Sequence, residues 1–167
     1  FIPNLKIYVS SYESILRNIE KYYSMESTVK EAVKEMSGGV TVEVEKEETK
    51  EVELSIDEAK SLAETAPIIR LMNQIITEAI TSNASDIHIE PQKRFLRIRY
   101  RIDGVLRDAM NLPKNIQPGL ISRAKIMANL DIAERRRPQD GRINLKFRGR
   151  EVDLRVSVLP GIFGEKV

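Results

Sequence analysis

Arg-Pro-Gln-Asp-Gly-Arg (residues 137–142) and Val-Asp-Leu-Arg-Val-Ser (residues 152–157) are the two runs of sequence that decide the fold of this chain. After a tight-turn signal at Asp140-Gly141, apolar and polar residues alternate, and they alternate again after Gly149. Two period-two runs around a short glycine turn predict a β-hairpin. Because successive side chains point to opposite faces of a strand, one face of the hairpin is polar, and we expect any chemistry to lie there.

The residues between position 55 and this hairpin show helical and extended patterns in turn. Apolar residues at helical spacing predict helices over residues 55–65, 66–83 and 120–130, and period-two runs predict strands over residues 85–91, 96–102 and 105–110. Asp103-Gly104 supplies a two-residue turn between the last two strands. The order of helix, strand, hairpin, helix and hairpin predicts an α+β fold, in which an antiparallel sheet carries helices on one face.

The first 60 residues carry weaker signals. An extended piece over residues 5–9 and helices over residues 10–23 and 27–36 are too little to bury a core of their own. We interpret residues 1–37 as the tail of a smaller N-terminal domain, or as a small unit that packs on something else, and residues 38–60 as a charged linker. Residues 61–167 then form the main domain. The sequence stops where a further strand would begin, so we expect the chain to be cut there.

Composition excludes several classes of function. The chain has 167 residues, a formal net charge of +2 and no cysteine, so disulfides, thiolate zinc sites and cysteine nucleophiles are excluded. No apolar run approaches the roughly 18 residues that span a bilayer, and no signal-peptide pattern opens the chain, so we expect a cytoplasmic protein without direct membrane insertion. Arginine and lysine crowd residues 93–155, which favours an anionic partner for that half of the chain.

Asp86, His88 and Glu90 share one face of a predicted strand, and a histidine and a glutamate two residues apart could both bind a metal. The chain has one histidine and no cysteine to complete a coordination sphere. A structural role for this strand motif is therefore favoured, and no metal is expected.

The polar faces of the predicted strands carry arginines, among them Arg97, Arg99, Arg101, Arg142 and Arg155. Their guanidinium groups could bind nucleic acid, a nucleotide or the acidic flank of a neighbouring subunit, and a solvated face held by salt bridges is an equally good interpretation. Aromatic residues make up only 5% of the chain, which argues against nucleic acid. The triphosphate-cradling pattern G-x-x-x-x-G-K-[ST] is absent, so the chain alone is expected to be non-catalytic and to hold no cofactor.

Six motifs follow one another along the second part of the chain. They are residues 66–76 (APIIRLMNQII), 84–91 (ASDIHIEP), 101–106 (RIDGVL), 130–136 (LDIAERR), 137–142 (RPQDGR) and 152–167 (VDLRVSVLPGIFGEKV). In this order they resemble the secretion ATPase superfamily, the hexameric motors of type II secretion and type IV pilus assembly. A string of six motifs is far more specific than any single one.

The resemblance implies a fold and a role for named residues. In that superfamily this region is a PAS-like α+β domain, the second N-terminal domain, which moves against the RecA-like ATPase domain that follows it. Residues 1–37 would be the end of a regulatory domain. Arg155 matches an arginine that contacts the terminal phosphates of ATP in the full-length protein. Further residues are expected at the interface with the neighbouring domain or subunit: Arg101, Asp103, Arg137, Gln139, Asp140 and Arg142.

The resemblance also implies cofactors and partners. It implies ATP and Mg²⁺ in the full-length protein, a homo-hexamer, and an inner-membrane platform protein that holds the hexamer at the cytoplasmic face of the membrane. The ending of the chain favours a pilus assembly ATPase, with a type II secretion ATPase as the alternative. An alternative of another class is a stand-alone phosphate or nucleic-acid binding module, which a G-x-x-x-x-G-K-[ST] run in the codons that follow would exclude.

Overall fold

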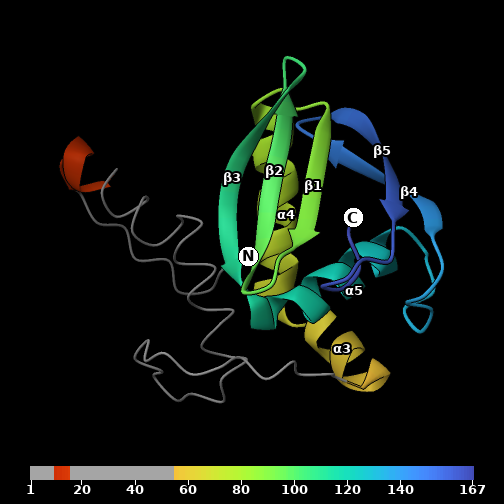
Figure 1. Cartoon of the computed structure of the whole chain (residues 1–167). Coiled ribbons are helices and arrows are strands. Elements are labelled where there is room, and N and C mark those ends of the chain that lie inside the picture. Colours follow the sequence, from red (N-terminus) through yellow and green to blue (C-terminus); the bar gives the residue numbers. More distant parts are fainter. Residues whose placement is uncertain (1–9, 16–54) are drawn as a thin grey trace.

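The computed structural model describes residues 10–15 and 55–167 (Figure 1). Residues 12–15 form a helical turn, and the hydroxyl of Ser11 accepts a hydrogen bond from the N–H of Ser14 at 3.3 Å. The extended piece predicted over residues 5–9, the helix predicted over residues 27–36 and most of the helix predicted over residues 10–23 lie outside the described residues.

The helices and strands predicted from periodicity after residue 55 are present. In chain order the elements are α3 (Ile56–Ala63), α4 (Ala66–Thr81), β1 (Asp86–Pro91), β2 (Phe95–Ile102), β3 (Val105–Pro113), the 3-10 helix η1 (Lys114–Ile116), α5 (Gln117–Met127), β4 (Gln139–Phe147) and β5 (Arg150–Val158). Helix α5 begins three residues earlier than predicted, since Pro118 fits the first turn of a helix. The α+β class is confirmed.

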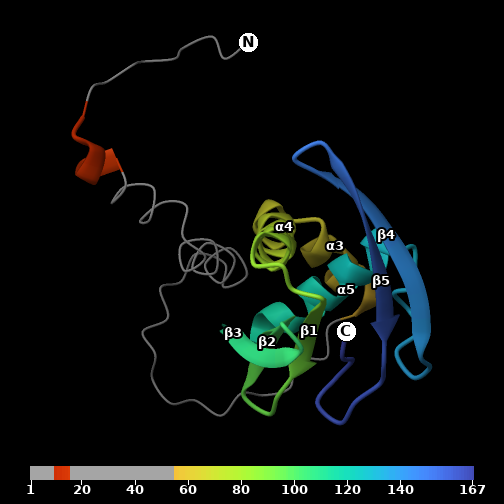
Figure 2. The same ribbon diagram turned by 90° about the horizontal axis from the view of Figure 1, so that it is seen from above.

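The strands form two antiparallel sheets, where one sheet was predicted. β1, β2 and β3 pair in that order, while β4 pairs with none of the other described strands except β5. In the view of Figure 2, helix α5 lies between the two sheets. Val167, and not β5, forms backbone hydrogen bonds with the first sheet, which have lengths of 2.8 and 3.1 Å to Ile89. The likeness to PAS domains stays a prediction.

Helix α3 starts inside the range predicted as a linker. Ser55 caps it with a complete capping box, in which its hydroxyl accepts from the N–H of Glu58 and the Glu58 carboxylate accepts from the N–H of Ser55. The carboxylate also accepts from the hydroxyl of Ser55, and the bonds from the N–H and the hydroxyl of Ser55 lower the pKa of Glu58. Ala59 and Ala63 are fully buried, so residues 56–63 are part of the packed structure. The domain boundaries themselves stay predictions.

The main core lies between helix α4 and the three-stranded sheet. Ile68, Leu71 and Ile75 of α4 are fully buried in one cluster with Leu96 and Ile98 of β2. The hydroxyl of the buried Tyr100 donates to the carbonyl of Ile75 at 3.1 Å, so the ring joins helix and sheet. Such burial on one side leaves the other face of the sheet to the polar residues of the strands.

Both hairpins turn as predicted, through two residues with positive φ. These are Asp103 (51°) with Gly104 (79°), and Arg148 (48°) with Gly149 (79°). Two consecutive residues with positive φ are typical of the turn that matches the right-handed twist of a two-residue hairpin.

The turn predicted at Asp140-Gly141 is wrong. Both residues lie within β4, where they pair with Ser157 and Val156. A Cβ atom at Gly141 would lie 2.5 Å from the carbonyl oxygen of Ala128 and 3.1 Å from its Cβ. The glycine is required here because the strand passes against the residue that follows α5, and not because the chain turns.

We expect Gly141→Ala to lower the free energy of unfolding by about 1–3 kcal/mol, since the added methyl group must push a backbone carbonyl aside. Urea unfolding followed by circular dichroism measures it. Asn144→Ala, an exposed change on the same strand, serves as the control and should stay within about 0.5 kcal/mol. Equal stability of the two variants would contradict the close packing of β4 on Ala128.

Candidate functional site

The outward face of the β4–β5 hairpin is built from polar cross-strand pairs. Its apolar face, which includes Ile143, Val156 and Val158, packs inward, so the alternate residues are turned outward. Four residues of β4 and four of β5 lie on this outward face, and all eight are exposed. The directly opposed pairs are Asp140 with Ser157, Arg142 with Arg155, Asn144 with Asp153 and Lys146 with Glu151.

Arg142 and Arg155 stand directly opposite each other on this face. Neither forms an ion pair with any residue between 55 and 167 or with residues 10–15. Guanidinium groups stay protonated at any relevant pH, and like charges directly opposite each other destabilise a sheet. We call these two residues the arginine pair. An anion with several oxygens would relieve their repulsion, and phosphate fits the planar donors of guanidinium well.

Asp140 lies beside the arginine pair but is engaged by Ser157. The hydroxyl of Ser157 donates to Oδ1 of Asp140 at 2.5 Å. This bond occupies one oxygen of the carboxylate, and Asp140 forms no ion pair with Arg142 among the described residues. The arginine pair is therefore not neutralised by the acidic residue next to it.

A loop that precedes β4 presents three consecutive arginines, Arg135, Arg136 and Arg137. The side-chain amide of Gln139 fixes this loop, since it donates to the carbonyls of Asp131 at 2.9 Å and Glu134 at 3.0 Å. Its oxygen accepts from the N–H of Asp131 at 2.9 Å. All the polar atoms of the Gln139 side chain are used inside the chain, so its role is to shape the loop.

Glu134 also stabilises this loop, through hydrogen bonds with its backbone. Its carboxylate accepts from the N–H groups of Arg136 at 2.7 Å and Arg137 at 3.2 Å, and these bonds lower the pKa of Glu134. The guanidinium of Arg137 lies 3.8 Å from the carboxylate, and its side chain is 85% exposed. Arg137 is thus available at the surface, at one end of the hairpin that carries the arginine pair.

Arg101 and Asp103, which were also predicted at an interface, belong to the other sheet. Arg101 donates from Nε to the Asp86 carboxylate at 3.0 Å and from its terminal nitrogen to the carbonyl of Gly104 at 3.1 Å. Asp103 is exposed at the turn between β2 and β3. The structure therefore divides the predicted interface residues between two sheets.

Glu90, from the predicted strand motif, is the centre of a cationic cluster. Its side chain is 7% exposed and lies 3.0 Å from Arg97, 2.7 Å from Arg99 and 2.9 Å from Lys166. Burial alone would raise the pKa of Glu90, but the hydrogen bonds from these three cations outweigh it and lower the pKa to about 2. Glu90 is therefore ionised and ties the last residues of the chain to β1 and β2.

His88 sits between Asp86 and Glu90 on β1. Burial first, and then the charge of Lys166, lowers the pKa of His88, although Glu90 and Asp86 act in the opposite direction. The imidazole is thus neutral at pH 7, and its Nε2 is buried without a hydrogen-bond partner among the described residues. Within residues 10–15 and 55–167, no three acidic or histidine side chains gather as a metal site would require.

Sequence reasoning missed a second buried ion pair. Lys125 of α5 is 1% exposed and pairs with Glu165, while its Nζ also donates to the carbonyl of Glu134 at 2.6 Å. A lysine in a helix of mixed composition gives no signal of burial. The contacts of Lys125 join three parts of the chain, which are helix α5, the segment after β5 and the loop that carries Arg135, Arg136 and Arg137. We call this last segment the arginine loop.

Comparison with known proteins assigns the chain to a protein family. The family model for "Type II/IV secretion system protein" matches residues 61–167. The chain belongs to this family. The string of motifs and the predicted superfamily are thereby confirmed.

Two kinds of relatives within the family resemble the chain. The type IV pilus assembly ATPase PilB of Myxococcus xanthus (strain DK1622) is 46% identical over 98% of the chain. The type II secretion system protein E is 54% identical over 66% of the chain in Klebsiella pneumoniae and 57% identical over 61% in Pseudomonas aeruginosa. The chain spans 28%, 22% and 20% of the length of these relatives, respectively.

None of the helices in the described part is both long and apolar enough to cross a bilayer. The chain is a homologue of a region of pilus assembly and type II secretion proteins.

Proposed function

We propose that this chain is the part of a type IV pilus assembly ATPase that responds to the phosphates of ATP through Arg155. The single observation that supports this most is the arginine pair: two exposed cations opposed on one strand pair, with no ion-pair partner among the described residues. The PilB relative aligns with 98% of the chain, whereas the two type II secretion relatives align with 66% and 61%. This difference favours pilus assembly over secretion.

In the whole protein, another part of the polypeptide would hold ATP and Mg²⁺, and the bound nucleotide would supply a terminal phosphate that carries several negative oxygens. Arg155 would contact those oxygens, and Arg142 opposite would add positive charge to the same face. The hydrogen bond from Ser157 occupies one oxygen of Asp140, a carboxylate beside Arg142 on this face. When the phosphate is lost, the face loses its anionic partner, so domain closure would depend on the nucleotide state.

The remaining surface residues fit an interface with the neighbouring ATPase domain or subunit. Arg137, Asp140 and Arg142 would lie at that interface, with Gln139 holding the loop that presents Arg137. Arg101 and Asp103 would serve a second contact, because they belong to the other sheet. The working assembly would be a homo-hexamer at the cytoplasmic face of the inner membrane, docked on a membrane platform protein.

In the full-length ATPase, we expect Arg155→Ala to lower the rate of ATP hydrolysis by about tenfold to a hundredfold. The change removes a charge that is exposed and has no ion-pair partner in the part of the chain that the structure describes, so folding should be unaffected. Steady-state phosphate release by the assembled protein measures the rate. Arg155→Lys should recover only part of it, since lysine keeps the charge but lacks the planar pair of donors.

The matched control is Lys146→Ala, which removes a cation from the same face, two positions beyond Asn144 on β4. It should leave hydrolysis within about twofold. If Arg155→Ala hydrolysed ATP at the unmodified rate in an assembled oligomer of normal size, the proposed phosphate contact would be wrong.

Type II secretion is the second candidate, because the relatives of that class are 54% and 57% identical over the residues that they share with the chain. Deletion of the gene separates the two. Loss of surface pili with normal export of folded proteins supports pilus assembly, and the reverse result supports secretion.

A further inference from the structure

The segment after β5 forms a closed loop that is fastened to the start of helix α5. Leu159 and Lys166 exchange two backbone hydrogen bonds of 2.8 Å at its neck. At its tip, the carbonyl of Phe163 accepts from Nε2 of Gln117 at 3.0 Å and from Nζ of Lys114 at 2.9 Å. We call residues 159–166 the closing loop.

Only glycine fits one position of the closing loop. Gly164 has a φ of +112°, and a Cβ atom there would collide with Nε2 of Gln117. The hydrogen bonds at the neck and the tip fasten the loop against the start of α5. The exposed side chains of the closing loop therefore extend from a fastened backbone. A preformed backbone lowers the entropy cost of binding a partner.

The closing loop exposes large apolar side chains. Ile162 is 94% exposed, Leu159 is 48% exposed and Phe163 is 41% exposed. Single apolar residues at a surface are ordinary, but three within five residues of a fastened loop concentrate exposed apolar area in one short segment. Such a segment suits contact with another protein.

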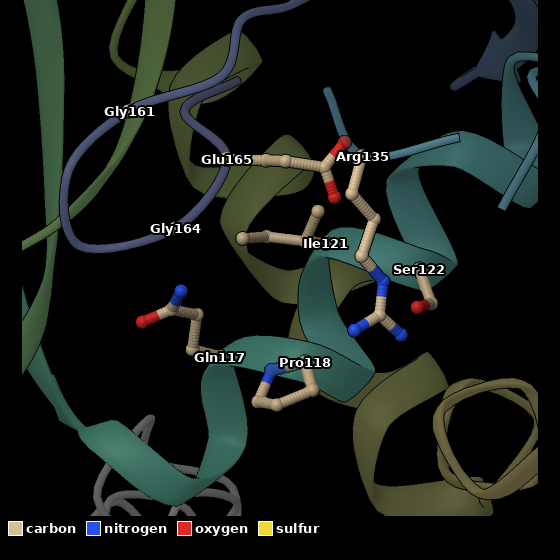
Figure 3. Close-up of a pocket in the computed structure, with 8 residues that line it drawn as sticks. All are labelled: Gln117, Pro118, Ile121, Ser122, Arg135, Gly161, Gly164 and Glu165. Atoms are coloured by element: carbon tan, nitrogen blue, oxygen red, sulfur yellow. The ribbon is translucent and has the colours of Figure 1, made fainter. Parts of the chain in front are cut away.

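A recess lies beside the loop, between it and helix α5 (Figure 3). Its lining residues are Gln117, Pro118, Ile121, Ser122, Arg135, Gly161, Gly164 and Glu165. Its volume is about 210 Å³, below the range of about 300–1,000 Å³ that is usual for small-molecule and cofactor sites. The recess is therefore large enough for one side chain of a partner and too small for a nucleotide.

Two side chains at the recess offer donors to an anion. Arg135 is exposed and has no ion pair with any residue that the structure describes, and the hydroxyl of Ser122 has no hydrogen bond within the same residues. Oε1 of Gln117 is a buried acceptor without a donor, so it disfavours an anion at its own end of the recess. Glu165 is the one carboxylate in the lining, and Lys125 pairs with it. The charge that remains at the recess is positive.

We propose that the recess and the closing loop form a docking site for an acidic segment of a partner protein. A glutamate or aspartate side chain of that segment enters the recess, pairs with Arg135 and accepts a hydrogen bond from Ser122. An apolar residue next to it packs on Ile162 and Leu159. Charge complementarity selects the segment, and the apolar contact adds affinity. This site is separate from the arginine pair and does not depend on the proposed function.

The test uses the ¹⁵N-labelled chain and two synthetic octapeptides, one that alternates leucine with glutamate and one that alternates leucine with glutamine. We expect the glutamate peptide to shift the backbone amide signals of residues 119–123 and 159–165, with a Kd of about 0.1–1 mM. Arg135→Glu should raise this Kd at least about tenfold. Arg136→Glu, at the neighbouring exposed arginine, is the matched control and should change it by less than about threefold.

Ile162→Ser provides an independent variant, since a side chain that is 94% exposed is not needed for folding. It should weaken binding of the glutamate peptide about threefold to tenfold. The proposal is overturned by the absence of shifts, by shifts confined to other residues, or by equal affinity for the glutamine peptide. It is also overturned if inorganic phosphate shifts the same signals at equal strength, or if the chain self-associates through Ile162.

Discussion

Lys125→Met should lower the free energy of unfolding by about 3–5 kcal/mol, because it leaves the partner of a buried ion pair without a counter-charge. Lys125 is 1% exposed and Glu165 is 11% exposed. The substitution also removes the donor to the carbonyl of Glu134. The substitution would therefore remove a side chain of α5 that forms polar contacts with both the arginine loop and the closing loop. Urea unfolding of the chain, followed by circular dichroism, measures the loss.

The double variant Lys125→Met with Glu165→Gln decides whether the effect comes from the ion pair. A neutral pair of similar size removes the uncompensated charge, so the double variant should be more stable than Lys125→Met alone by about 1–2 kcal/mol. Lys146→Met, an exposed change on β4, is the control and should stay within about 0.5 kcal/mol. Additive losses from the two single changes would show that the ion pair is not coupled.

Glu90→Gln should cost about 2–4 kcal/mol of stability, since Arg97, Arg99 and Lys166 would then repel one another without a central anion. The same carboxylate also predicts acid sensitivity. Its pKa is about 2 in the folded chain, below the ordinary value of 4.5, so the folded state favours the ionised form. This stabilisation is complete above pH 4.5 and is lost as the pH falls from there toward 2.

The acid sensitivity can be measured by urea unfolding at several pH values between 2 and 7. We expect Glu90→Gln to flatten the decline in stability below pH 4.5, while Glu151→Gln, an exposed change on β5, should keep the decline of the unmodified chain. Identical pH profiles for Glu90→Gln and the unmodified chain would mean that the cationic cluster contributes nothing to the folded state.

Much of the fold follows from local pattern. Capping at Ser55, Pro67 near the start of α4 and the two glycine turns mark the elements because each acts on its immediate neighbours. The turn predicted at Asp140-Gly141 was wrong. The glycine is needed there because the carbonyl of Ala128 leaves no room for a side chain, and not because the chain turns. The division into two sheets could not be predicted either, because strand alternation does not state which strands pair.

The candidate site shows the same limit. Alternation along β5 was enough to place Arg155 on the polar face, and the resemblance to the superfamily gave it a role. That Arg142 stands directly opposite depends on the register of β4 against β5, which only the structure provides. The ion pairs of Glu90 with Lys166 and of Lys125 with Glu165 join residues far apart in the sequence, so no local pattern could have indicated them.

The backbone pairing of Val167 with Ile89 has a consequence for how other chains can add to the molecule. β1 and β3 are the outer strands of the first sheet, and open edges of this kind attract foreign strands. At β1 the hydrogen-bonding groups of Ile89 are already taken, and the side chain of Lys166 is drawn over the same strand toward Glu90. A partner that recognises this sheet by strand addition would therefore have to join it along β3.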